Sequence, residues 1–182
     1  MQDRDVIIKQ AGDGDWDSAV AVQQSAFGTN EEAELVVKLL DDPSAQPCLS
    51  LLAWQARQVV GHILFTRAQV ESSSALPASL LAPLAVNPQV QRQGIGGRLI
   101  AQGLGLLEQQ GVGPVFVLGY PDYYRRFGFE PAGPLGFQPP YPISAEQSDA
   151  WRVYVPASAR SIACRGRVSC ADALMDPKYW RE

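Results

Sequence analysis

The chain has 182 residues, of which 46% are hydrophobic and 19% charged, and its 15 basic and 19 acidic side chains give a formal net charge of −4. These values are typical of a folded domain with a sizeable core and exclude an intrinsically disordered chain. A chain with this net negative charge lacks the broad positive surface that nucleic-acid binding requires. It is compatible with a cationic substrate without identifying one.

Neither membrane insertion nor metal binding is predicted. The N-terminal residues contain no signal-peptide core, and no apolar run reaches the 18 residues needed to span a bilayer. The three cysteines form no Cys-x-x-Cys pair, and His62 is the single histidine. We therefore expect reduced thiols, no metal, no contact with a membrane and a cytoplasmic location.

The first part of the chain predicts two helices followed by a β-hairpin. A short β-branched strand at 6–8 precedes helices expected at about 15–27 and 31–40, where apolar residues recur at helical spacing. Two strand-like runs follow, Leu49–Gln55 and Gln58–Val70. Because only two residues separate them, they are expected to form an antiparallel hairpin.

The next stretch predicts a β-α-β unit. Serines at 72–74 indicate a loop, after which residues 80–86 form an apolar strand. A glycine-containing turn at 89–97 leads into a helix at about 96–110 with one apolar face. The strand expected at 114–118 has no polar alternation, which is typical of a buried strand with a parallel neighbour.

The last third predicts a short helix and the strands that close the sheet. The helix is expected at 122–127, and a strand starts at Gly128-Phe129. Residues 131–142 are rich in proline and favour an ordered loop. Closing strands are expected at 153–155 and 162–168. No internal repeat and no second core are evident in the sequence.

The residues best suited to bind a ligand are those of the turn at 91–97. Glycines there let the backbone approach a ligand closely, and the first amides of the following helix point toward the turn. With the helix dipole, these amides favour a phosphate or pyrophosphate, and Arg92 and Arg98 can add charged contacts. The alternative is that the glycines only permit a tight turn. No Gly-Lys-Ser/Thr follows, and Leu99 stands where a dinucleotide fingerprint requires Gly or Ala.

At these residues the sequence resembles the GCN5-related N-acetyltransferase (GNAT) family. The family's cofactor motif is Gln or Arg, two residues, Gly, any residue, and Gly or Ala, and it is matched by Gln91, Gly94 and Gly96. A second match is Tyr-Arg-Arg-Phe-Gly-Phe at 124–129, where the family often has a tyrosine four residues before Gly-Phe. The longer run at 117–124 is similar to a bacterial subgroup in which an aspartate often stands at the position of Tyr120.

The resemblance implies the acyl-CoA N-acyltransferase fold, an α/β fold with a mixed, splayed β-sheet flanked by helices. Residues 1–182 are expected to form a single domain, with a cofactor-binding core at about 80–130 and closing strands at about 131–182. The implied reaction transfers an acetyl group from acetyl-CoA to a primary amine, by direct attack in a ternary complex.

The resemblance also implies roles for individual residues. The main chain of Leu84, Ala85 and Val86 is expected to bind the pantetheine arm like an added strand and to polarise the thioester carbonyl. Tyr124 is expected to be the general acid for the CoA thiolate, because a tyrosine can donate a hydrogen bond to a leaving group whose thiol has a pKa of about 8.5. The pyrophosphate is expected to bind at Gln91, Arg92, Gln93, Gly94, Ile95, Gly96 and Gly97.

The general base and the acceptor stay open. Glu71, Asn87 with a bound water, and Asp122 are candidates for the base, and their spacing does not choose between them. The acceptor is expected to be a small-molecule or peptide amine, and a homodimer is left open. Transfer of a longer acyl chain, a hydroxyl acceptor, and a non-catalytic acyl-CoA-binding sensor module are the alternatives.

Three further residues favour a structural interpretation. His62 lies inside a predicted strand, where a histidine is more often part of the core than of a site. Glu31 and Glu32 stand at the start of the second helix, where acidic side chains stabilise the positive end of the helix dipole. None of the three is therefore expected to take part in the chemistry.

Overall fold

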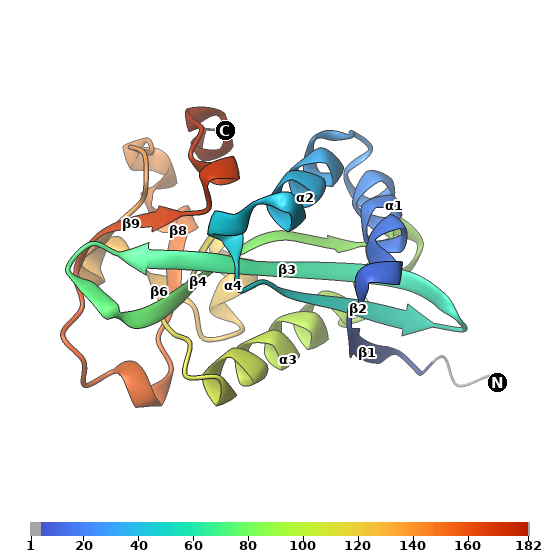
Figure 1. Ribbon diagram of the computed structural model, residues 1–182, viewed down its shortest axis with the longest axis horizontal. Helices are drawn as coiled ribbons and strands as arrows, with labels where there is room; N and C mark the ends of the chain where they lie inside the picture. Colours follow the sequence, from blue (N-terminus) through green and yellow to red (C-terminus); the bar gives the residue numbers. More distant parts are fainter. Residues whose placement is uncertain (1–4, 182) are drawn as a thin grey trace.

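The computed structural model describes residues 5–181, without the side chains of residues 73–75. Within this range the chain forms a nine-stranded mixed sheet in the order β1-β2-β3-β4-β5-β8-β6, with β9 beside β3 and β7 beside β9. Helices α1 and α2 cover one face of the sheet and α3 covers the other (Figure 1). The predicted α/β fold with a mixed sheet flanked by helices is confirmed.

The helices begin and end close to their expected positions. They are α1 (Trp16–Phe27), α2 (Glu31–Asp41), α3 (Ile95–Gln109) and the short α4 (Pro121–Arg125). Within residues 5–181, none of them combines the length and the apolar character that crossing a bilayer requires. The strands are β1 (Ile7–Gln10), β2 (Leu49–Gln55), β3 (Gln58–Val70), β4 (Ser73–Val86), β5 (Val115–Leu118), β6 (Glu130–Pro131), β7 (Phe137–Gln138), β8 (Trp151–Tyr154) and β9 (Gly166–Cys170).

The hairpin of β2 and β3 has the predicted boundaries. Ala56 and Arg57 form its two-residue turn, with φ angles of 49° and 67°. Such left-handed turn residues match the right-handed twist of the flanking strands. The register runs from Gln55 opposite Gln58 to Leu49 opposite Phe65.

The prediction of a loop at 72–74 is wrong, because β4 already begins at Ser73. Only Glu71 and Ser72 form the turn between β3 and β4, and Val70 pairs with Ser73. The long second half of β3 provides main-chain partners for this segment whatever its side chains are. Strand pairing therefore overrides the loop preference of the serines.

The sheet splays between β4 and β5, as the resemblance implies. These parallel strands pair at only two positions, Ser79 with Val115 and Leu80 with Phe116. Further along β4, the partners of Ile63 and Phe65 are Leu84 and Leu81, so β4 carries one extra residue there. A bulge of this kind bends a strand. Beyond the paired residues, β4 and β5 separate.

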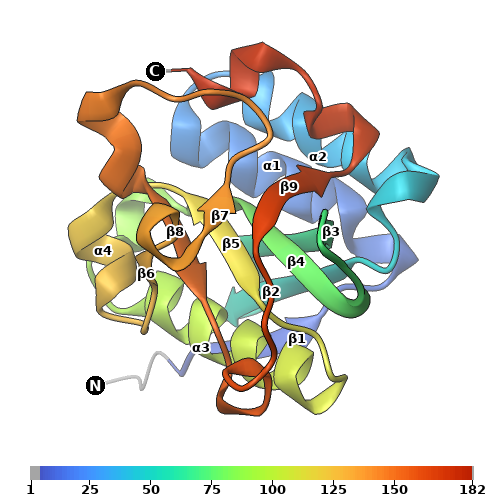
Figure 2. The ribbon, with the colours of Figure 1, turned by 90° about the vertical axis from the view of Figure 1, so that its left-hand side faces the viewer.

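The C-terminal segment completes the sheet at two places. β8 pairs with β5 on one side and β6 on the other. β9 pairs with Ala68–Val70 of β3. These residues lie beyond Phe65, the last residue of β3 that pairs with β2. Figure 2 shows β9 running across the front of the sheet at this point. The closing strands begin at Trp151 and Gly166 instead of the expected 153 and 162.

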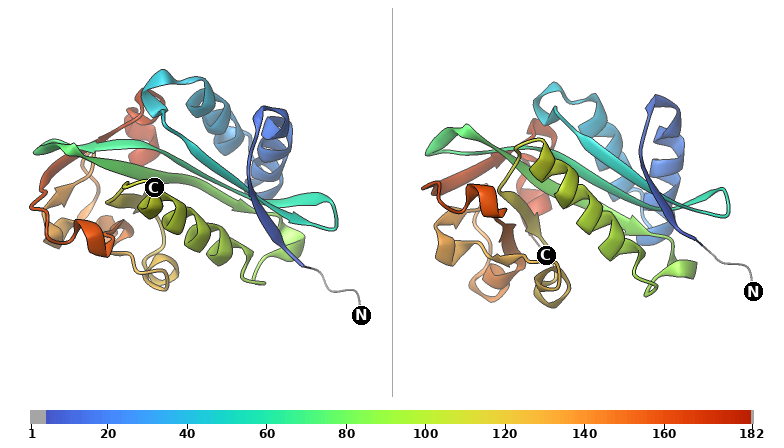
Figure 3. Two further views of the ribbon diagram at one scale, coloured as in Figure 1. Left: turned by 60° about the horizontal axis from the view of Figure 1, so that its bottom comes forward. Right: turned by 90° about the horizontal axis from the view of Figure 1, so that it is seen from below.

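Apolar side chains fill both faces of the sheet. On the α2 face, Trp151 stacks on Phe116 at a centroid distance of 5.2 Å, and both are buried. On the other face, Leu99 and Ile100 of α3 pack with Phe65 and other strand residues. Figure 3 shows α3 lying across this face. The central strands are thus covered on both sides, as the lack of polar alternation in β5 predicts.

Candidate active site

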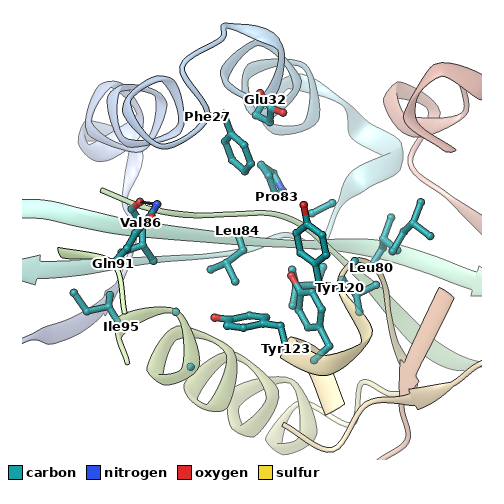
Figure 4. A pocket seen from close by; sticks show the side chains of 18 of the residues that line it. Phe27, Glu32, Leu80, Pro83, Leu84, Val86, Gln91, Ile95, Tyr120 and Tyr123 are labelled. Atoms are coloured by element: carbon teal, nitrogen blue, oxygen red, sulfur yellow. Dashed lines mark hydrogen bonds between the residues drawn. The ribbon is translucent and has the colours of Figure 1, made fainter. Parts of the chain in front are cut away.

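A cavity of about 930 Å³ lies where β4 and β5 separate. β4 supplies one wall, and the end of β5 with α4 supplies the facing wall. The first turn of α3 lies at one end, and the end of α1 with the start of α2 lies at the other (Figure 4). Because α1 and α3 cover opposite faces, the cavity is lined from both sides of the sheet.

The β4 wall offers main-chain groups that no described strand uses. The amide of Asn87 donates to the carbonyl of Val60 in β3, over 2.8 Å. Since main-chain direction alternates along a strand, Ala85 also faces β3, whereas Leu84 and Val86 face the cavity. The lining agrees, because it includes Leu84 and Val86 but not Ala85.

The turn after β4 is held by its own side chain and by two left-handed residues. Gln91 Nε2 donates to the carbonyl of Val86 over 3.0 Å, which ties the turn to the end of β4. Arg92 and Gly94 have φ angles of 62° and 81°. This geometry brings the chain sharply round into α3 within three residues. Gln93 is exposed in this turn and does not line the cavity.

The start of α3 presents three main-chain amides. The amide of Arg98 donates to the carbonyl of Gly94 over 3.1 Å, as the first intrahelical bond of α3. The amides before it have no acceptor within the helix, and no described side chain caps this end. They belong to Ile95, Gly96 and Gly97, all of which line the cavity.

Two of these glycines are also required by packing. A Cβ atom at Gly96 would overlap the hydroxyl oxygen of Tyr123, and one at Gly97 would lie 2.8 Å from a ring carbon of Phe127. The close contact of α3 with α4 and with Phe127 just beyond it therefore depends on both glycines. The packing interpretation of these glycines holds, and it does not exclude a ligand at their main-chain amides.

Positive charge gathers at the α3 end of the cavity. Arg92 lines it, as does Arg126, whose guanidinium lies 5.5 Å from the centre of the Tyr123 ring. Arg98 does not take part, since its side chain donates to the carbonyl of Val6 over 2.7 Å. The phosphate contact expected of Arg98 is therefore wrong, and Arg126, which no sequence motif indicates, lines the cavity instead. The α3 end can accept an anionic group.

Tyr124 lies in the facing wall with 8% of its surface exposed. It packs edge-on against Phe129 and Tyr123, at centroid distances of 5.5 and 5.2 Å. Burial, followed by the neighbouring Tyr123, raises the pKa of Tyr124 well above its ordinary value. Among the described residues none forms a hydrogen bond with its hydroxyl. The hydroxyl therefore keeps its proton and is free to donate it to a bound molecule.

None of the candidate bases lines the cavity. Glu71 is exposed in the turn between β3 and β4. The Asn87 side chain accepts from the amide of Gln89, and Asp122 forms an exposed ion pair with Arg125. Their proposed role is not supported by their positions.

The one acidic side chain among the described lining residues is Glu32. It is half-buried at the start of α2, and Thr29 Oγ1 donates to its Oε2 over 2.9 Å. Its position in the first turn of α2 confirms the expected helix-start charge, and Glu32 also lines the cavity. The only signal in the sequence was Thr29 three residues earlier, and that spacing is equally typical of a helix cap.

His62 is wholly buried in β3 and lies outside the cavity. Its Nδ1 lies 2.8 Å from Gln23 Nε2 and its Nε2 lies 2.9 Å from Ser50 Oγ. Burial lowers the pKa of His62 to about 4, so the ring is neutral at physiological pH. The structural interpretation of His62 agrees with this position. Within the described residues, no cluster of three or more histidine, cysteine or acidic side chains could hold a metal ion.

Comparison with known proteins gives one consistent family. A family model described as an acetyltransferase (GNAT) domain matches residues 7–132, a range that includes the turn at 91–97 and Tyr124. The uncharacterized N-acetyltransferase YjhQ of Escherichia coli (strain K12) is 47% identical over 153 residues, which cover 83% of this chain and 84% of YjhQ.

Two solved structures extend the similarity to the whole fold. The GNAT family N-acetyltransferase YhbS from Escherichia coli, in complex with CoA, has a TM-score of 0.87 at 27% identity, covering 97% of this chain and 95% of YhbS. A GNAT family acetyltransferase from Brucella melitensis, in complex with acetyl-CoA, has a TM-score of 0.74 at 27% identity, covering 94% of this chain and 99% of the Brucella chain.

Proposed function

The chain belongs to the GNAT acetyltransferase family of acyl-CoA-dependent N-acyltransferases, and from this premise we propose that it transfers the acetyl group of acetyl-CoA to a primary amine within a ternary complex. The observation that carries the proposal is the cavity through the splayed sheet. It joins a helix start whose first amides are uncapped, a stretch of β4 that does not pair with β5, and a buried tyrosine.

The α3 end of the cavity suits the pyrophosphate of acetyl-CoA. The amides of Ile95, Gly96 and Gly97 and the positive end of the helix dipole favour an anion there. Arg92 and Arg126 add charge. In the proposal, Gln91 shapes this site through its bond to β4, and Gln93 and Gly94 contribute the turn that exposes the amides.

The pantetheine arm is proposed to lie along β4. Leu84 and Val86 direct their main-chain groups into the cavity, and those other than the Val86 carbonyl, which accepts from Gln91, can pair with an extended amide chain as a neighbouring strand would. Ala85, between them, holds the segment on β3. An amide of this stretch can also donate to the thioester carbonyl oxygen and stabilise the negative charge that develops on it.

The proposed reaction is a direct acyl transfer. The acceptor ammonium first loses a proton to solvent, and its nitrogen then forms a bond to the thioester carbonyl carbon. The tetrahedral species collapses as the C–S bond breaks, leaving the electron pair on sulfur. Tyr124 donates its proton to that sulfur and regains one from solvent, while the nitrogen loses its second proton. The products are the acetylated amine and CoA.

Partners and location belong to the same proposal. The acceptor partner is proposed to be a small-molecule or peptide amine. Burial raises the pKa of Cys48 to about 11 and of Cys170 to about 12, which keeps both as unreactive thiols at neutral pH. Such thiols suit the proposed cytoplasmic location.

Ligand-induced stabilisation and CoA release test this function together. Acetyl-CoA at 100 times its dissociation constant should add about 2.7 kcal/mol to the free energy of unfolding. NAD⁺ is the control and should add nothing. Free CoA should then appear when amines are supplied. Stabilisation by NAD⁺ but not by acetyl-CoA would overturn the assignment, and stabilisation without CoA release for any amine would favour the acyl-CoA sensor.

A further inference from the structure

The end of the cavity opposite α3 has its own charge. Glu32 is the one carboxylate among the described lining residues, and Arg92 and Arg126 are the cations. Both arginines belong to the α3 side, since Arg92 precedes that helix and Arg126 lies over Tyr123, which packs against Gly96. Lys178 covers the ring of Tyr179 at 4.8 Å but does not line the cavity. The α2 end therefore presents a single negative charge.

The same end is also aromatic, and part of this aromatic surface is exposed. Phe27 and Tyr120 expose 43% and 78% of their surfaces, and both line the cavity. The other strongly exposed large apolar side chains of the described chain lie elsewhere. Figure 4 shows Phe27, Glu32 and Pro83 on the α1–α2 side of the cavity, with Tyr120 extending toward them from the wall formed by β5 and α4. Solvent-exposed aromatic side chains that line a cavity are typical of a binding site.

The C-terminal residues continue this surface. Tyr179 and Trp180 line the cavity, and Trp180 Nε1 donates to the carbonyl of Leu174, which lines it as well. Leu174, Trp180 and Leu35 of α2 belong to one core cluster. The acceptor end is therefore built from a firmly packed apolar floor and two exposed rings.

From this combination we infer that the acceptor is an arylalkylamine, a primary amine with a flat aromatic group and one positive charge. The inference rests on the proposed function and names the substrate class of the same site. Glu32, oriented by Thr29, attracts the ammonium, and Phe27 and Tyr120 contact the ring. Glu32 acts here as a specificity-determining residue.

Charge separates this acceptor from other amines. An amine that also carries a carboxylate meets repulsion from Glu32. A polyamine or an aminosugar with several amines brings cations for which the described lining provides no further carboxylate. A small aliphatic amine satisfies Glu32 but leaves Phe27 and Tyr120 uncovered. An arylalkylamine satisfies both features.

The test uses tyramine and tryptamine as probes, with glutamate and spermidine as the contrasting amines. With acetyl-CoA saturating, CoA release should give a kcat/KM for tyramine at least about tenfold above that for glutamate or spermidine. Glu32→Gln should raise the KM for tyramine about tenfold or more, with a smaller change in kcat. The KM for acetyl-CoA should stay unchanged.

Glu31→Gln is the matched control, because Glu31 stands at the same helix start but is exposed and outside the cavity. It removes the same charge and should leave the KM for tyramine unchanged. Glu32→Asp retains the charge, so its KM for tyramine should be much closer to the wild-type value than that of Glu32→Gln. Tyr120→Ala should raise the KM for tyramine more than that for ethylamine, because only tyramine has a ring to lose.

The outcomes separate this inference from the proposed function. Absence of acetyl-CoA-induced stabilisation in the wild type would remove the function itself. Normal stabilisation with no turnover of tyramine and tryptamine would overturn the inference alone. Equal kinetics for Glu32→Gln and Glu31→Gln would overturn it too, as would glutamate or spermidine proving as good a substrate as tyramine.

Discussion

Two adjacent tyrosines line the cavity, and their surroundings assign them different tasks. Tyr124 is nearly buried, with a raised pKa and an unengaged hydroxyl. The Tyr123 hydroxyl lies against Gly96 at the start of α3. Tyr124→Phe should therefore lower kcat about 100-fold, the effect of losing a positioned acid, and leave acetyl-CoA affinity unchanged.

Steady-state kinetics with a good acceptor and a thermal-shift titration with acetyl-CoA check this prediction. Tyr123→Phe is the control, and its kcat should stay within about a factor of two. An unchanged kcat for Tyr124→Phe, with chemistry rate-limiting, would leave water as the proton donor.

His62 makes the stability of the fold depend on pH. Its pKa is about 4 in the folded protein and about 6.5 in an unfolded chain, so the unfolded state binds more protons between these values. The contribution of His62 to stability is present above pH 6.5 and is lost as the pH falls toward 4. At pH 5 the free energy of unfolding should be lower than at pH 7.5 by about 2 kcal/mol on this account.

Urea unfolding at both pH values measures this loss, and His62→Gln isolates it. The variant should lose about 2 kcal/mol less than the wild type between pH 7.5 and pH 5, since the other titrating groups are common to both proteins. Parallel pH profiles for the two proteins would show that His62 does not carry the effect.

At the residue scale, the sequence predicts only those site residues that a motif defines. Tyr124 follows from its spacing to Gly128-Phe129, and the cavity does include it. Glu32 could not be predicted as a site residue, because an acidic side chain at a helix start is favoured by the helix dipole alone. Glu32 lines the cavity only because α2 packs over the gap in the sheet, and this tertiary contact is not encoded in the local sequence.

Among the elements, α3 and the turn before it provide a matched pair of arginines for testing the anion site. Arg92 lines the cavity, whereas Arg98 is engaged with the carbonyl of Val6. Arg92→Gln should weaken CoA binding about fivefold, equivalent to about 1 kcal/mol, and more at low salt than at high salt. Arg98→Gln should leave CoA affinity unchanged while slightly lowering stability.

Calorimetric titration with CoA at two salt concentrations makes the comparison. Equal affinities for wild type and Arg92→Gln at low salt would place the pyrophosphate away from Arg92. An equal loss of CoA affinity in Arg98→Gln would indicate a general effect of net charge instead of a direct contact with Arg92.

Local patterns predict elements well where neighbours in sequence are also neighbours in space. The β2–β3 hairpin has both boundaries as expected, because a two-residue link leaves one antiparallel solution. The start of β4 was missed, since its serines pair with a strand whose length the local sequence does not reveal. The same holds for β8, whose first residue, Trp151, is fixed by stacking on Phe116.

For the whole molecule, the C-terminal segment decides whether a closed core exists. β8 lies between β5 and β6, and Trp151 is buried against Phe116. Truncation after Pro131 removes β8 and β9 and uncovers Phe116. Since truncating one buried large aromatic side chain to alanine already costs about 3 to 5 kcal/mol, the shortened chain should be molten or aggregated.

Size-exclusion chromatography and near-UV circular dichroism measure this outcome. Trp151→Ala is the milder test, and it should lower the free energy of unfolding by about 3 kcal/mol or more. A truncated chain that stays monomeric, keeps its near-UV signal and binds CoA would make the C-terminal segment an independent appendage.

The order of elements predicts the general architecture and the family resemblance implies the gap between β4 and β5, but neither predicts what covers the α2 end of the cavity. Tyr179 and Trp180 line the cavity from the last residues of the described chain. No local pattern links them to Phe27 or Glu32, about 150 residues earlier. The end of the cavity that we propose selects the acceptor is therefore the end that the sequence alone does not predict.

β9 reaches the sheet late in synthesis, because Val168 pairs with Val70, 98 residues before it. A ribosome adds about 5 to 20 residues each second, so roughly 5 to 20 s pass between the two strands. During that interval the far end of β3 has unpaired main-chain groups, and such an edge is a template for aggregation. The nascent chain is thus more exposed to misassembly than the finished protein, and slower translation lengthens that period.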